Sequence, residues 1–80
     1  MLPAITRQLI LAIIDHEDRP AGTPLFTISE WLDRDRQEVR PWVRELVEAG
    51  DVLEVMPDRY VVLHPPVGNA TRILRPVLMQ

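Results

Sequence analysis

The chain has 80 residues, of which 46% are hydrophobic and 26% are charged, and this composition predicts one folded domain rather than a disordered segment. It contains no cysteine, which excludes a disulfide framework and a thiolate metal site, and no apolar run approaches the roughly 20 residues of a membrane span. The formal net charge of −3 argues against indiscriminate binding to polyanions but leaves room for a local basic surface. Because the first residues also lack the basic region of a signal peptide, we expect a cytoplasmic protein.

The first predicted element is a helix over residues 3–16. Pro3 suits the first helical turn, where the missing N–H has no partner to lose. Apolar residues recur on one side of this helix, and we expect that side to be buried; they are Ile5, Leu9, Ile10, Ile13 and Ile14. The charged segment 15–24 contains two prolines and a glycine and is predicted to be a loop.

A short strand and a short helix are predicted next. Leu25 and Phe26 are apolar but suffice only for a bridge-like strand. Thr27 and Glu30 form a capping box, which predicts a helix over roughly residues 28–33. Its inward side is expected to hold Ile28, Trp31 and Leu32.

A longer helix is predicted over residues 36–49, because Asp35 and Glu38 form a second capping signature and Gly50 supplies a left-handed stop. Pro41 would then lie in the second turn, where proline removes a hydrogen bond and clashes with the preceding turn, at a cost of about 3 kcal/mol. Two outcomes remain open: the helix begins near Glu38, or it begins with an irregular turn.

Arginine recurs every fourth residue along this helix, at Arg36, Arg40 and Arg44. The neighbouring side carries an apolar stripe of Val39, Val43, Leu46 and Val47. A helix that docks along one side and presents arginines along the adjoining edge is suited to a nucleic-acid groove. The alternative is a solvated face on which the arginines pair with local carboxylates. Trp42 flanks the stripe, where it contributes to the core or to self-association.

Residues 52–63 are predicted to form a hairpin of two strands around the turn Pro57-Asp58-Arg59, with Tyr60 packed on the helices and its hydroxyl near solvent. After residue 64 the prolines are incompatible with a long helix, although the last residues of the chain are apolar. We therefore divide the chain into a domain of residues 1–64 and a tail of residues 65–80 that packs on the body or on a second subunit.

Three segments carry a resemblance to a known family: T-I-S-E-W-L at residues 27–32, V-R-P-W-V-R-E-L-V-E-A-G at residues 39–50, and the ribbon at residues 51–63. Their order resembles the winged helix-turn-helix family of DNA-binding regulators. In length the chain looks like the small pilus-operon regulators of the FaeA-like group and minimal phage regulators. The resemblance implies an α+β fold of three helices with a two- or three-stranded hairpin as the wing. The stretch between Trp31 and Val39 is a couple of residues shorter than is usual in the family.

The resemblance also implies a role in transcription regulation and a set of DNA-binding residues. The helix 36–49 would enter the major groove, Arg34 would approach a phosphate from the turn before it, and Arg59 would reach the minor groove or its phosphates from the wing. The candidate residues are Arg34, Arg36, Gln37, Arg40, Arg44 and Arg59. The expected partner is double-stranded DNA, bound by a homodimer or a cooperative array, because small modules bury only about 600–1,000 Å² on DNA.

Catalysis finds little support in the sequence, and we expect no enzyme, no cofactor and no metal. His16 and His64 do not have the spacing of metal ligands, Ser29 has no base near it in sequence, and there is no glycine-rich phosphate loop. The rival interpretation is a winged-helix module or small inhibitor that docks on a protein partner instead of DNA. Its support is the acidic total charge and the carboxylates around the arginines, namely Asp33, Asp35, Glu38, Glu45 and Glu48.

Overall fold

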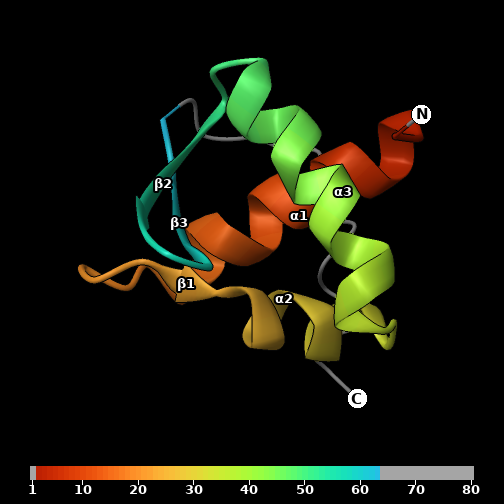
Figure 1. Cartoon of the computed structure of the whole chain (residues 1–80), viewed down its shortest axis with the longest axis horizontal. Coiled ribbons are helices and arrows are strands. Elements are labelled where there is room, and N and C mark those ends of the chain that lie inside the picture. Colours follow the sequence, from red (N-terminus) through yellow and green to blue (C-terminus); the bar gives the residue numbers. More distant parts are fainter. Residues whose placement is uncertain (1, 64–80) are drawn as a thin grey trace.

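The computed structural model describes residues 2–63 and shows the predicted α+β architecture (Figure 1). In chain order the elements are α1 (Ala4–Glu17), β1 (Thr23–Pro24), α2 (Leu25–Leu32), α3 (Arg36–Glu48), β2 (Val52–Met56) and β3 (Arg59–Val62). The strands form one antiparallel sheet in the order β1-β3-β2. The predicted tail, residues 65–80, lies outside the described residues. No helix within residues 2–63 has the length and apolar character needed to cross a membrane.

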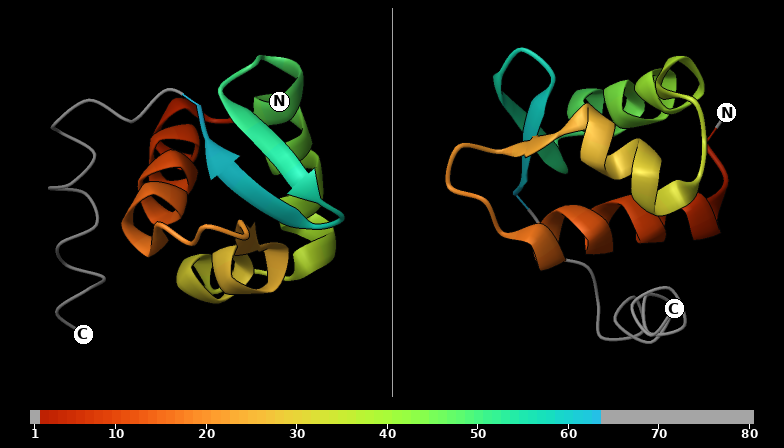
Figure 2. Two further views of the ribbon diagram at one scale, coloured as in Figure 1. Left: turned by 90° about the vertical axis from the view of Figure 1, so that its left-hand side faces the viewer. Right: turned by 90° about the horizontal axis from the view of Figure 1, so that it is seen from below.

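The core lies where the three helices meet the inner face of the hairpin, which stands beside the helical body in both views of Figure 2. Its fully buried side chains include Ile10, Ile13, Leu25, Ile28, Val39, Val43, Leu46 and Val52. Every residue of α1 from 10 to 14 is buried, whereas Ile5 is 56% exposed. The prediction that Ile5 is buried was wrong: Leu2 and Leu9 pack against the core on either side of it in sequence, so Ile5 lies off the buried side of α1.

The second helix begins earlier than predicted, and the capping box at Thr27 does not form. The strand expected at Leu25 and Phe26 is instead Thr23–Pro24, which pairs with β3, and Leu25 opens α2. The backbone N–H of Leu25 donates to the carbonyl of Asp58 in the hairpin turn, at 2.9 Å. One of the N–H groups that a helix start leaves unsatisfied thus finds a partner 33 positions along the chain, so the start of α2 needs no local side-chain cap.

The third helix begins at its predicted cap and continues through the proline. The carboxylate of Asp35 accepts a hydrogen bond from the backbone N–H of Gln37, at 2.8 Å. The helix is continuous from Arg36 to Glu48, so neither of the two starts considered for it is adopted. Pro41 lies in its second turn and leaves the carbonyl of Gln37 without the usual N–H donor.

The predicted stop at Gly50 is confirmed, with φ of +85°. Its N–H donates to the carbonyl of Val47 at 3.1 Å, and the N–H of Asp51 donates to the carbonyl of Leu46 at 3.0 Å. These two bonds form a Schellman motif, which turns the chain from α3 into β2. The register of the hairpin then places Val52 opposite Val62 and Glu54 opposite Tyr60, with an irregularity between Glu54 and Met56.

Candidate nucleic-acid interface

The structure brings four of the six predicted DNA-binding residues together on the solvent side of α3. These residues are Arg36, Gln37, Arg40 and Arg44, and all four are exposed. On the same helix Val39, Val43 and Leu46 are completely buried. The core therefore holds α3 along one side, and the arginines occupy the free edge next to it.

Arg40 connects this edge to the hairpin turn. Its Nη1 donates to Oδ1 of Asp58 at 2.6 Å, and its Nη2 lies 3.4 Å from Oδ2. The hydrogen bond and the charge of Asp58 raise the pKa of Arg40 above its usual value. Because the two side chains are 46% and 47% exposed, water screens the pair and it is free to exchange partners.

The remaining two predicted arginines lie elsewhere. Arg34 occupies the turn between α2 and α3, where its Nη1 is 3.3 Å from Oε1 of Glu38. Arg59 is the first residue of β3 rather than part of the turn itself, and its Nη1 donates to the carbonyl of Gly22 at 3.4 Å. The guanidinium of Arg59 thus points toward β1, so it is not part of the edge formed by α3.

Two carboxylates that the sequence did not single out lie beside the arginine edge, those of Glu54 and Asp58. A hollow of about 50 Å³ between α3 and the hairpin is lined by Arg40, Arg44, Val47, Glu48, Glu54 and Tyr60. Glu54 also accepts a hydrogen bond from the backbone N–H of Asp58, at 3.0 Å, which orders the turn. The arginine edge is therefore bordered by negative charge on its hairpin side. No local pattern could have revealed this, because Asp58 lies 18 positions from Arg40.

Tyr60 packs into the core as predicted, with 5% of its surface exposed, and it also lines the hollow beside Glu54. Burial is the main reason that its pKa rises, and the negative charges of Glu54 and Asp58 add to the effect, so that the pKa reaches about 12. Arg40 acts in the opposite direction but does not offset the rise. The phenol is thus neutral at physiological pH and serves the core and the hairpin.

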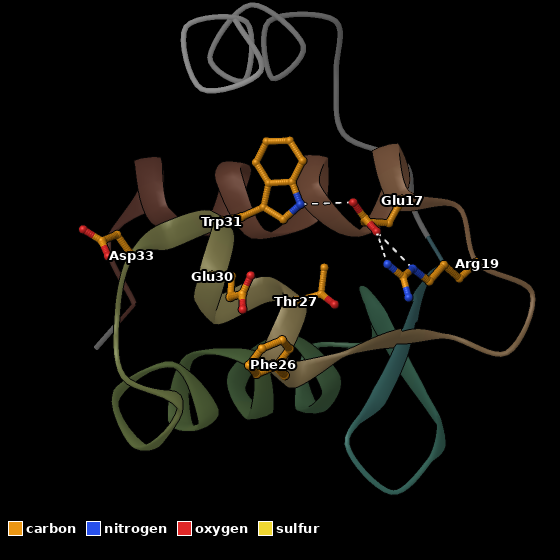
Figure 3. Close-up of a pocket in the computed structure, with 7 residues that line it drawn as sticks. All are labelled: Glu17, Arg19, Phe26, Thr27, Glu30, Trp31 and Asp33. Atoms are coloured by element: carbon orange, nitrogen blue, oxygen red, sulfur yellow. Dashed lines mark hydrogen bonds and ion pairs between the residues drawn. The ribbon is translucent and has the colours of Figure 1, made fainter. Parts of the chain in front are cut away.

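A second, larger hollow lies between α1 and α2 and has an acidic lining (Figure 3). It measures about 700 Å³ and is lined by Glu17, Arg19, Phe26, Thr27, Glu30, Trp31 and Asp33. Phe26 is 55% exposed there. Because its carboxylates outnumber its single arginine, this hollow would repel a phosphate backbone.

Glu17 organises one side of this larger hollow. Its Oε1 accepts hydrogen bonds from Nε and Nη2 of Arg19 at 3.0 and 2.8 Å, and its Oε2 accepts one from Nε1 of Trp31 at 3.1 Å. The His16 ring meets the Trp31 ring edge-on, with centroids 5.7 Å apart. Burial alone would raise the pKa of Glu17, but the bonds from Arg19 and Trp31 and the charges of Arg19 and His16 outweigh it and lower the pKa below its usual value.

Comparison with known proteins gives no relative from which a function could be transferred. No family model matches the sequence, and neither the curated proteins nor the solved structures yield a match. Within residues 2–63 no three histidine, cysteine, aspartate or glutamate side chains are grouped so that they could hold a metal ion.

Proposed function

We propose that the protein binds double-stranded DNA as a small winged helix-turn-helix regulator of transcriptional or phage type. The observation that carries this proposal is the exposed edge of Arg36, Arg40 and Arg44 on a helix whose other side is anchored in the core. Arginine can bind the O6 and N7 atoms of guanine with two hydrogen bonds, and an exposed helix fits the major groove. In this proposal α3 reads the groove, Gln37 contributes from its first turn, and the hairpin lies over the flanking backbone.

The ion pairs at the surface are compatible with this role. Arg34 and Arg40 have carboxylate partners, but all the groups involved are about half exposed, so phosphate oxygens can replace those partners at little cost. The negative net charge weakens sequence-independent binding to the DNA backbone. Contacts to bases therefore contribute a larger share of the affinity. A single small module rarely gives enough affinity, so we expect a homodimer or a cooperative array.

A mobility-shift titration on mixed duplex DNA tests the proposal. The protein should bind at low salt, and its affinity should fall steeply as salt is raised to a moderate concentration, because phosphate contacts release counterions. The variant Arg40→Ala/Arg44→Ala should lose binding while its circular dichroism spectrum stays the same. Retained binding by this variant would refute a groove-reading α3.

A matched pair of single substitutions shows whether DNA binding depends on where an arginine lies or only on its positive charge. Arg44 forms no ion pair with any described residue, so Arg44→Ala should weaken DNA binding without disturbing a contact. Arg19→Ala removes the same charge beyond the end of α1, where Arg19 is bound to Glu17. Equal losses in the two variants would show that net charge, and not α3, determines binding.

The second candidate function is docking on a protein partner, and the hollow of Figure 3 is the observation in its favour. There the exposed Phe26 lies beside Glu30 and Asp33, which form no ion pair within residues 2–63, and such a surface suits a protein rather than DNA. In that case the chain would act as an interaction module or a small inhibitor. Failure of the wild-type protein to bind any duplex at low salt would favour this candidate.

A further inference from the structure

Exposed apolar side chains are concentrated on the hairpin. Six large hydrophobic side chains within residues 2–63 are at least 40% exposed, and four of them lie between residues 53 and 63. Single exposed apolar residues are common on soluble proteins, whereas a contiguous group of them marks an interaction site. The four side chains are those of Leu53, Val55, Met56 and Leu63.

Part of this group lies on the outer face of the hairpin, away from α3. Glu54 and Tyr60 line the hollow toward α3. Successive side chains of a strand point to opposite faces, so Leu53 and Val61 lie on the outer face, where they are direct cross-strand partners. Leu63 lies two positions beyond Val61 and continues the ladder with a backbone hydrogen bond, so it shares this face. We call Leu53, Val61 and Leu63 the hairpin patch.

No element within residues 2–63 covers the hairpin patch. In the left view of Figure 2 the strands β2 and β3 lie in front of α3, and α1 lies beside them rather than over them. Figure 1 likewise shows the hairpin at the left boundary of the fold, with the helices on its other side. The patch is therefore open to a segment from outside the described residues.

The C-terminal segment of the same chain has the composition and the reach to cover the patch. Residues 73–79 read I-L-R-P-V-L-M, with five apolar residues and no acidic one. The chain leads to them from Leu63, which is itself part of the patch, through the nine residues 64–72. Nine extended residues span up to about 30 Å, and the principal extents of the fold are 30 × 25 × 25 Å. The covalent link also gives the segment a high effective concentration at the patch.

Charge favours this segment over a second copy of the fold. All twelve acidic residues but only seven of the nine arginines lie within residues 1–63, whereas Arg72 and Arg75 are the only charged residues that follow. Asp15 and Asp18 line the hollow that Val61 borders, so negative charge lies beside the patch. Two folds that met through their patches would repel each other, whereas the basic segment is attracted.

We propose that residues 73–79 dock on the hairpin patch of the same chain. The apolar side chains of the segment cover Leu53, Val61 and Leu63, and the arginines in and beside the segment lie toward the negative charge at the end of α1. The segment thereby shields an apolar strand pair that would otherwise invite association with other chains. Because the patch faces away from α3, docking leaves the proposed DNA surface open, and either proposal can fail alone.

Paramagnetic relaxation enhancement in the full-length ¹⁵N-labelled protein, without DNA, locates the segment. The chain has no cysteine, so Gln80→Cys gives a single attachment point for a nitroxide spin label, next to Met79. The amide signals of the hairpin patch should lose most of their intensity, and chemical reduction of the nitroxide should restore it. The amides of Arg34 and Arg36, on the opposite side of the fold in Figure 1, should keep their intensity.

A matched pair of double variants tests the patch itself. Leu53→Thr/Leu63→Thr removes two apolar side chains from the patch and should abolish the intensity loss. Ile5→Thr/Phe26→Thr removes two apolar side chains of similar exposure elsewhere and should retain it. Equal intensity losses in the two variants would overturn the proposal.

Two further measurements hold even if the patch variant does not fold. Leu74→Ser/Leu78→Ser leaves residues 1–63 unchanged and should also abolish the intensity loss; an unaltered pattern would contradict docking of residues 73–79. In a mixture of spin-labelled ¹⁴N protein and unlabelled ¹⁵N protein, the patch should keep its full intensity. An equal loss in this mixture would assign the patch to a second copy, and no loss in either sample would leave it to a partner protein. Both results would refute docking within the chain.

Discussion

Replacing Asp58 by asparagine should strengthen DNA binding. Asp58 holds the guanidinium of Arg40 through two contacts, of 2.6 and 3.4 Å, and it places a negative charge at the edge of the proposed DNA surface. Its φ is +62°, a conformation that asparagine tolerates well. The backbone bonds of the turn, from Leu25 to the Asp58 carbonyl and from the Asp58 N–H to Glu54, do not involve the altered group.

The magnitude follows from what the released arginine gains. A free Arg40 can make a bidentate contact to a base or a phosphate without first giving up a carboxylate. Because an exposed ion pair contributes only about 0.5 kcal/mol, we expect the affinity to rise about two- to threefold at about 0.1 M salt. If the new contact is to phosphate, the slope of log affinity against log salt should steepen by about 0.9. Fluorescence anisotropy of a labelled duplex across a salt series measures both quantities.

Asp18→Asn is the control for this prediction, because Asp18 also has a positive φ, of 45°, and lies at the end of α1. It loses the same charge without touching α3 and should bind DNA almost as the wild-type protein does. An Asp58→Asn protein that binds no more tightly, or an equal gain in Asp18→Asn, would refute the reasoning.

Three further predictions concern the fold. Burial, followed by the charge of Glu54, raises the pKa of Tyr60 from 10.0 to about 12, so its contribution to the free energy of unfolding is complete below pH 10 and declines as the pH rises toward 12. The ultraviolet absorbance of this single tyrosine should titrate with a midpoint near pH 12, and Glu54→Gln should lower that midpoint. A midpoint near pH 10 in the wild-type protein would contradict the burial of Tyr60. Gly22→Ala should destabilise the protein more than Gly50→Ala in urea unfolding, because a Cβ at Gly22 would lie 2.7 Å from a side-chain methyl of β2, whereas one at Gly50 meets nothing within 4 Å. The Gly50→Ala loss should be about 1–2 kcal/mol from its positive φ alone, and equal losses would speak against the close approach at Gly22. Pro41→Ala should restore a helical hydrogen bond and raise the free energy of unfolding by about 1–3 kcal/mol. Thermal melting measures this change, and an unchanged melting temperature would contradict a proline within the second turn of α3.

The elements that could be predicted from the sequence are those fixed by neighbouring residues. Asp35 and Gly50 mark the ends of α3 through local hydrogen bonds, and the turn after Met56 marks the hairpin. The start of α2 was missed because its first N–H is satisfied by Asp58, far along the chain. Ile5 was misplaced because the apolar residues of α1 cover more of its circumference than the core does, and periodicity does not show where the buried side ends.

The candidate site shows the same division. The spacing of Arg36, Arg40 and Arg44 sufficed to place them on one exposed edge, since that follows from helix geometry alone. The contact between Arg40 and Asp58 could not be predicted, because it requires the hairpin to fold back beside α3. The charge that borders the proposed DNA surface is therefore a property of the tertiary structure.

Amide chemical-shift mapping of the full-length protein during a duplex DNA titration tests the central proposal most directly. If α3 reads the groove, the largest shifts should fall on the non-proline residues from 36 to 44 and on Asp58 in the hairpin turn, and they should reverse as salt is added. The amides of Glu17, Glu30 and Trp31, which line the hollow between α1 and α2, should remain unchanged. Shifts confined to the hollow between α1 and α2, or no shifts at low salt, would contradict a DNA-reading α3.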